Sequence, residues 1–175
     1  MSRINWERLY GVLDNITPLP ADCGTLCEKR CCSVREGVGI YLFPGEEVIF
    51  PPGGNWYSLE EYDDVDYYTG SKGTVLNCTG ICEREKRPLA CRLFPLAPYL
   101  DREGRLSIIT DVDAIFICPL ARVNDMDSIN PDFIKAVGSV WEELLCIEKV
   151  REGVIAYSTR VDAQASDPWQ RLFSR

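Results

Sequence analysis

Eight of the nine cysteines of this 175-residue chain lie between residues 23 and 118, and the chain contains no histidine. The eight form three short runs and one isolated cysteine that is followed by proline. Their positions are Cys23, Cys27, Cys31, Cys32, Cys78, Cys82, Cys91 and Cys118. Thiolates bind structural zinc and hold iron-sulfur clusters. The pattern therefore predicts a metal site built from sulfur, with these eight residues as candidate ligands.

The spacing allows two ways of building such a site. Two thiolates separated by two to four residues converge from one turn, and two such turns supply the four sulfurs of a structural zinc site. The pairs 23/27 and 78/82 meet this requirement. Alternatively, the cysteines at 23, 27 and 31 recur every fourth residue, like the closely spaced ligands of an iron-sulfur cluster, and one remote cysteine would complete the set. The spacing leaves both arrangements open, and with them the choice between one site and two.

Two features favour iron and sulfur. Proline directly after a ligand, as in Cys118-Pro119, occurs in bacterial ferredoxin runs. Basic residues outnumber acidic ones by three to one in residues 23–35 and by four to two in residues 78–92, although the formal net charge is −8. Because nearby cations stabilise thiolates, we expect Arg87 and Arg92 to contact the cofactor. The predicted cofactor is a 4Fe-4S cluster, with zinc as the alternative.

Other uses of the cysteines fit less well. The first twenty residues lack the features of a signal peptide, and no apolar run reaches membrane-spanning length, so we expect a cytoplasmic protein without a membrane partner. Thiols are kept reduced in the cytoplasm, which argues against disulfides. Cysteine hydrolases use a histidine base, and neither a phosphate loop nor a dinucleotide fingerprint is present. No catalytic motif is therefore identified, and the acidic balance argues against nucleic acid as a partner.

Helices are predicted at both ends of the chain. Asn5 can cap a helix whose apolar residues recur at helical spacing as far as Leu13. Asn130 and Pro131 begin a second helix, which is predicted to pack on the core over residues 130–150. Cys146 falls in this helix and is predicted to be a buried core cysteine, not a ligand. Residues 154–175 are predicted to be a polar tail.

Short strands are predicted between the helices. They fall at residues 38–43, 48–50 and 74–76, with a helical turn at 44–47 as the alternative for the second, and a hairpin follows within residues 92–111. Ser58 to Glu61 has the form of a helix capping box. The length and the 46% hydrophobic content suit one domain over residues 1–175, with a metal-binding core at 23–95. We therefore expect an α+β domain with loop-borne cysteines, short strands and a long C-terminal helix.

The segment around Cys91 resembles a known family. Arg87-Pro88-Leu89-Ala90-Cys91-Arg92-Leu93-Phe94-Pro95, together with the earlier run ending in Cys31-Cys32, resembles the YkgJ-type cysteine-cluster proteins, which are regarded as zinc- or iron-chelating. The resemblance covers residues 23–95 and implies that all seven cysteines in that range belong to the metal-binding set. The family in turn resembles the cysteine-rich part of flagellin lysine methylases, where an iron-sulfur cluster accompanies the methyl-transfer machinery.

These observations predict a metal-binding protein with a structural, redox or regulatory role, whose partner is the metal ion or cluster. One alternative is an enzyme or accessory subunit of protein modification, methylase-like, that recognises a protein partner through the acidic aromatic stretch at residues 56–68. Another is a zinc-stabilised interaction module, which chelation would unfold.

Overall fold

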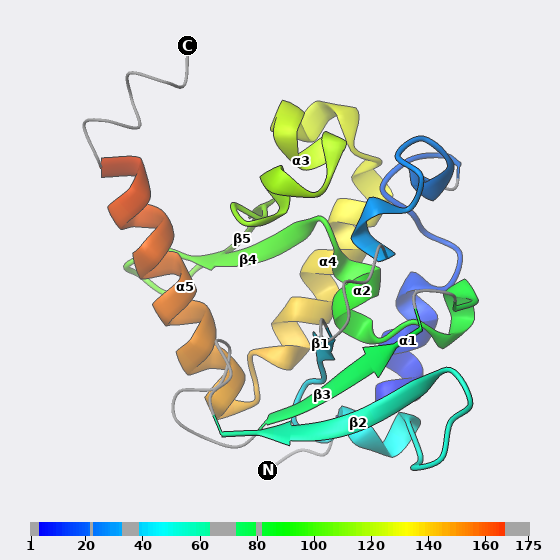
Figure 1. The fold of residues 1–175 in the computed structure, drawn as a ribbon. Helices are drawn as coiled ribbons and strands as arrows, with labels where there is room; N and C mark the ends of the chain where they lie inside the picture. The colour runs from blue at the N-terminus through cyan, green and yellow to red at the C-terminus, as the bar shows by residue number, and fades with distance from the viewer. Residues whose placement is uncertain (1–3, 22, 33–38, 64–72, 80–81, 167–175) are drawn as a thin grey trace.

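Helices and short antiparallel strands alternate along the chain in the computed structural model, which describes residues 4–21, 23–32, 39–63, 73–79 and 82–166 (Figure 1). The α+β class of a small single domain is confirmed. The elements are α1 (Trp6–Leu13), β1 (Ile40–Tyr41), β2 (Tyr57–Tyr62), β3 (Gly73–Cys78), α2 (Leu89–Leu93), β4 (Leu96–Leu100), β5 (Leu106–Thr110), α3 (Pro119–Val123), α4 (Pro131–Leu144) and α5 (Glu148–Ser166).

The helices predicted from capping signals begin where the sequence indicated. The side chain of Asn5 accepts a hydrogen bond from the backbone N–H of Arg8 at 3.0 Å, and that of Asn130 accepts one from Asp132 at 3.0 Å. Helices α1 and α4 contact each other. Their buried apolar faces contribute much of the core, including Leu9, Leu13, Phe133, Val137, Val140 and Leu144.

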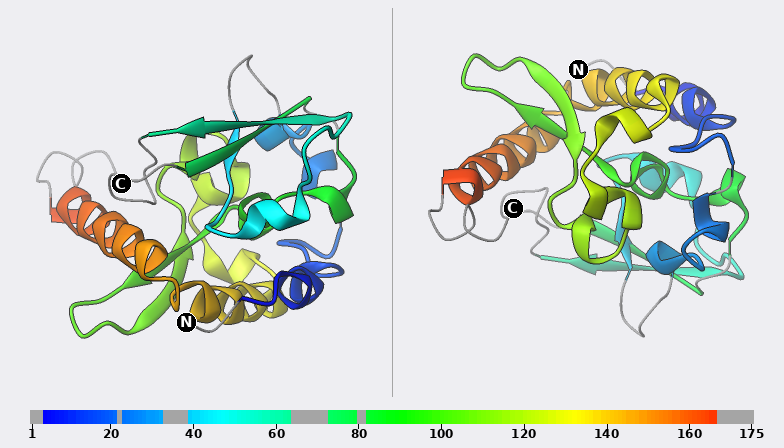
Figure 2. Two further views of the ribbon diagram at one scale, coloured as in Figure 1. Left: turned by 90° about the horizontal axis from the view of Figure 1, so that it is seen from below. Right: turned by 90° about the horizontal axis from the view of Figure 1, so that it is seen from above.

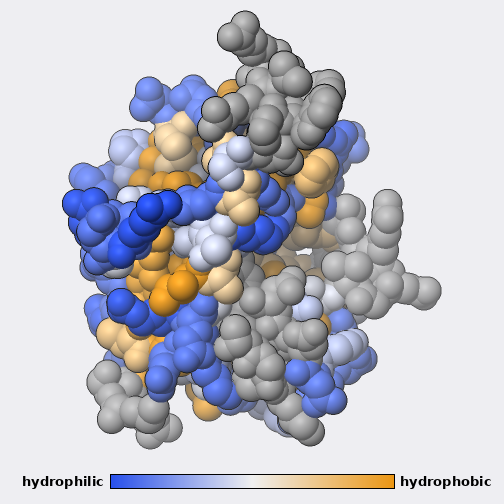
Figure 3. All heavy atoms as spheres, turned by 90° about the vertical axis from the view of Figure 1, so that its left-hand side faces the viewer, coloured by the Kyte–Doolittle hydropathy of each residue, from blue (hydrophilic) through white to orange (hydrophobic). Residues whose placement is uncertain are grey.

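The C-terminal region corrects the prediction. Helix α4 ends at Leu144, and a separate helix, α5, runs from Glu148 to Ser166, so the stretch predicted to be a tail is helical through residue 166. Helix α5 packs on β4, where Ser158 accepts a hydrogen bond from the backbone N–H of Leu100 at 2.9 Å. The hairpin β4–β5 contacts α4 as well as α5 (Figure 2). The side of the molecule that carries α5 is mostly hydrophilic, with hydrophobic spots between (Figure 3).

The strands form a three-stranded sheet with the order β1-β3-β2 and the two-stranded hairpin β4–β5. The predicted capping box at Ser58 to Glu61 is wrong as a helix start, because these residues form β2 and pair with β3 in the register Ser58↔Asn77 and Glu61↔Thr74. The second predicted strand is also wrong, since Glu46–Ile49 is a 3-10 turn, as the alternative had it. Part of the first predicted strand, at residue 38, lies outside the described residues.

Within the described part of the chain, no helix combines the length and the apolar character needed to cross a membrane.

Candidate metal centre

The eight clustered cysteines line two adjoining cavities. The first has a volume of about 110 Å³, and its cysteines are Cys23, Cys27, Cys31, Cys91 and Cys118. The second has a volume of about 230 Å³, and its cysteines are Cys31, Cys32, Cys78, Cys82 and Cys91. Both cavities are lined by Cys31, Cys91, Arg87, Phe94 and Ile117. Residues up to 95 positions apart in the sequence therefore line two cavities that share part of their walls.

The first cysteine run reaches this space through an unusual backbone. Glu28 and Lys29 adopt the left-handed conformation with φ of 54° and 53°, which side-chain-bearing residues rarely take. A hydrogen bond from the Lys29 N–H to the carbonyl oxygen of Gly24, at 2.9 Å, holds this turn. Cys27 and Cys31 flank the turn, and Cys31 Sγ lies 3.9 Å from Cys32 Sγ. Backbone strain of this kind is typical of functional loops.

Cys91 is placed by helix α2, and a buried carboxylate anchors the start of that helix. Glu46 is fully buried, and its side chain accepts hydrogen bonds from the backbone N–H groups of Leu89 at 2.7 Å and Phe43 at 2.8 Å, and from the hydroxyl of Tyr10. Leu89 is the first residue of α2. Glu46 therefore ties the cysteine-bearing helix to α1, a role that no local signal in the sequence indicated.

The two arginines predicted to contact the cofactor differ in their surroundings. Arg87 lines both cavities, and its Nε is buried without a hydrogen-bond partner among the described residues. Arg92 lines the first cavity, but all three of its side-chain nitrogens donate to protein groups: the carbonyl oxygens of Arg87, Glu85 and Tyr10 and the carboxylate of Asp14. Arg92 thus holds the loops of the site together, whereas Arg87 retains a donor for another group.

The clustered thiols oppose one another's ionisation. The hydrogen bond with Cys32 and burial raise the pKa of Cys31, and the neighbouring cysteines raise it further. Although part of Cys91 is accessible through the cavities, the protein atoms packed around its thiol raise its pKa to about 12, with contributions from Cys32, Cys78 and Cys82. Burial also raises the pKa of Cys82, while Arg87 acts in the opposite direction. So many thiolates can coexist only beside compensating positive charge, which bound metal would supply.

The structure separates the two cysteine pairs that the zinc arrangement had joined. Cys23 and Cys27 line only the first cavity, whereas Cys78 and Cys82 line only the second. Within the described residues, no three or more Cys, Asp or Glu side chains converge closely enough to hold a single metal ion. The thiols stand instead on the walls of the cavities.

Cys146 lies away from both cavities, between α4 and α5. The prediction that it is buried is wrong: Cys146 is exposed, and its thiol faces the carbonyl oxygen of Glu142 at 3.7 Å. Helix α4 has already ended at Leu144, so the apolar face of that helix does not extend to residue 146. Cys146 therefore offers a matched control for the clustered cysteines.

Comparisons with known proteins leave the resemblance as a prediction, because no protein-family model, no curated protein and no solved structure matches the chain.

Proposed function

We propose that this protein binds metal through its eight clustered cysteines, and that the metal is held as an iron-sulfur cluster. The main support for the proposal is that all eight cysteines line two adjoining cavities, whereas the ninth, Cys146, lines neither. Reduced core cysteines would instead pack against apolar side chains without regard to one another.

The form of the site favours a cluster over a single zinc ion. A structural zinc ion draws four ligands to one point, whereas a cluster occupies a volume and takes its thiolate ligands from the surrounding walls. The unpartnered Nε–H of Arg87 fits this interpretation, because sulfide and thiolate sulfurs accept hydrogen bonds that tune a cluster. The positive charge of Arg87 would offset part of the negative charge of the bound centre.

The distribution of the thiols suits two centres of four sulfurs each. Three cysteines line only the first cavity and three line only the second, while Cys31 and Cys91 line both. One shared cysteine assigned to each cavity completes two sets of four. Cys31 lines both cavities and is exposed, so a bound centre would have one side near the surface, which suits electron exchange or sensing.

Reduction of the anaerobically purified protein tests this proposal. We expect thiolate-to-iron absorption bands that bleach on addition of dithionite, together with a paramagnetic signal in the reduced protein. A colourless protein that contains zinc and shows no response to dithionite would support the interaction-module alternative and contradict the iron-sulfur proposal.

A protein partner is a second candidate, favoured by exposed apolar residues beside the first cavity. Leu26 and Ile117 line that cavity and are 73% and 44% exposed, and the neighbouring Phe116 and Val123 are 80% and 67% exposed. Leu26 and Ile117 are far apart in the sequence, yet the segment of Leu26 and the segment that leads into α3 line the same cavity. Exposed patches of this kind mark interaction sites. The exposed basic residues next to them in sequence, Lys29, Arg30 and Arg122, favour a partner with an acidic rim.

Phe116→Ser is expected to release such a partner. The protein retained by the wild type in a pull-down should be lost with this variant and at high salt, since both apolar burial and charge would hold it. Val48→Ser, which changes a 65% exposed side chain that lines neither cysteine cavity, is the matched control and should retain it. Equal retention by both variants would remove the patch from consideration.

A further inference from the structure

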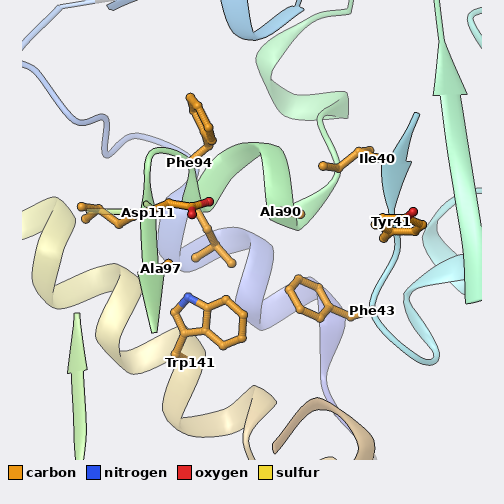
Figure 4. A pocket seen from close by; sticks show the side chains of 10 residues that line it. Ile40, Tyr41, Phe43, Ala90, Phe94, Ala97, Asp111 and Trp141 are labelled. Atoms are coloured by element: carbon orange, nitrogen blue, oxygen red, sulfur yellow. The ribbon is translucent and has the colours of Figure 1, made fainter. Parts of the chain in front are cut away.

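A third cavity shares Phe94 with the two cavities that the cysteines line. It has a volume of about 110 Å³ and is enclosed by residues of β1, α2, β4 and α4 (Figure 4). Its walls are mostly apolar and aromatic, formed by Ile40, Tyr41, Phe43, Ala90, Leu93, Phe94, Leu96, Ala97 and Trp141. Three of these residues, Ile40, Ala90 and Phe94, also line the second cysteine cavity. An apolar cavity with a few polar groups is the usual form of a small-molecule site.

One polar group in this cavity is a buried donor without a partner. Trp141 is only 3% exposed, and its Nε1–H makes no hydrogen bond within the described part of the chain. Figure 4 shows the edge of the ring that carries this nitrogen turned toward Ala97 and Asp111. An unpaired buried N–H is unfavourable, so a ligand that places an acceptor beside it gains affinity. The T-shaped contact with Phe43, at 5.5 Å between ring centroids, fixes the indole in this orientation.

The other polar group is the carboxylate of Asp111. Its Oδ1 accepts hydrogen bonds from the Tyr157 hydroxyl at 3.0 Å and from the Asp113 N–H at 3.0 Å. Among the residues that the structure describes, both donors bond to the same oxygen, which leaves Oδ2 for a further donor. Asp111 directly follows β5, and its half-buried carboxylate points into the cavity (Figure 4). Burial raises the pKa of Asp111, although its hydrogen bonds and the charge of Arg160 act in the opposite direction.

We propose that this cavity binds a small neutral molecule with an apolar ring and a hydroxyl group, such as a phenol. A hydroxyl can accept from the Trp141 N–H and donate to Asp111, which a protonated amine or a carboxylate cannot do. A cavity of about 150 Å³ accommodates benzene, whereas this one has a volume of about 110 Å³, so the ring of a phenol must extend into the opening between the half-buried residues of the wall. The site is separate from the proposed metal function, since no cysteine lines it.

The probe for this proposal is phenol, with benzene as the ring without the hydroxyl. In spectra of the ¹⁵N-labelled protein, phenol should shift the indole signal that is lost in Trp141→Phe, with an affinity of about millimolar. Benzene should bind about tenfold more weakly, because it leaves both polar groups unpaired. Asp111→Asn should weaken phenol binding about tenfold while leaving benzene binding nearly unchanged. Trp141→Phe also enlarges the cavity, so its expected effect is about a tenfold lower preference for phenol over benzene.

Two variants control for general effects. Trp56→Phe removes an indole that lies outside this cavity, and Asp162→Asn alters an exposed carboxylate that accepts from Tyr99. Both should bind phenol as the wild type does. The proposal is overturned if phenol does not bind, which would mean that the cavity takes water only, or if folded Asp111→Asn binds phenol as tightly as the wild type. Equal affinities for phenol and benzene would also overturn it.

Discussion

Cys91→Ser is expected to lower metal affinity more than about 100-fold, because Cys91 lines both cavities. Loss of a residue that only supports a metal ligand lowers affinity about 10–100-fold, and loss of a ligand itself should have a larger effect. The metal content of the protein purified without oxygen should therefore fall to a small fraction of the wild-type value. Elemental analysis per folded chain measures this directly, with circular dichroism to confirm that the variant is folded.

Cys146→Ser is the matched control, since it changes the one cysteine outside both cavities, and it should leave the metal content unaltered. Cys118→Ser separates one centre from two. Cys118 lines only the first cavity, so two centres predict that about half of the metal remains, whereas a single centre shared by both cavities predicts a larger loss. Equal loss of metal in Cys91→Ser and Cys146→Ser would mean that the division of the cysteines into eight and one is mistaken.

Glu46→Ala is expected to destabilise the protein by about 3–5 kcal/mol, the largest effect on folding that we anticipate. The substitution leaves three buried donors without an acceptor, namely the N–H groups of Phe43 and Leu89 and the Tyr10 hydroxyl. For a chain of this size, the melting temperature should fall by about 10 °C or more. Glu47→Ala changes the adjacent exposed carboxylate and should cost less than about 1 kcal/mol. Similar losses in the two variants would contradict the role assigned to Glu46.

The contribution of Glu46 to the stability of the folded protein should increase as the pH is lowered. Burial raises the folded-state pKa of Glu46 above its ordinary value of 4.5, so the folded state binds this proton more tightly than the unfolded chain does. The contribution of Glu46 to stability is therefore fully present below pH 4.5 and is lost as the pH rises through the folded-state pKa. Relative to Glu46→Gln, which does not titrate, the wild type should gain stability as the pH is lowered from neutral toward 4.5. Urea unfolding of both proteins across this range measures the difference, and a constant difference would contradict the assignment.

The elements predicted correctly are those whose signals are local. Asn5 and Asn130 cap α1 and α4, and the hairpin predicted within residues 92–111 is formed by β4 and β5. Helix α5 was missed because its polar residues are spread around the helix and its stability comes from packing on β4. Strand β2 was missed because the pairing with β3, a long-range interaction, outweighs the helix-capping pattern at Ser58.

For the candidate site, the sequence indicated which residues gather but not how they divide. The thiol chemistry and the absence of histidine singled out the eight cysteines, and the cavities bring the same eight together. The grouping of Cys23 with Cys27 and Cys118, apart from Cys78 and Cys82, depends on how α2 and the segment before α3 fold over the first run. The anchoring carboxylate Glu46 has partners 36 and 43 residues away, so no spacing rule could identify it.

The iron, acid-labile sulfide and zinc content of the full chain, purified without oxygen, tests the central claim most directly. We predict iron and sulfide in equal amounts, about four of each per chain for one 4Fe-4S cluster and about eight for two, with little zinc. A protein that is folded and contains neither iron with sulfide nor zinc would contradict metal binding by the clustered cysteines.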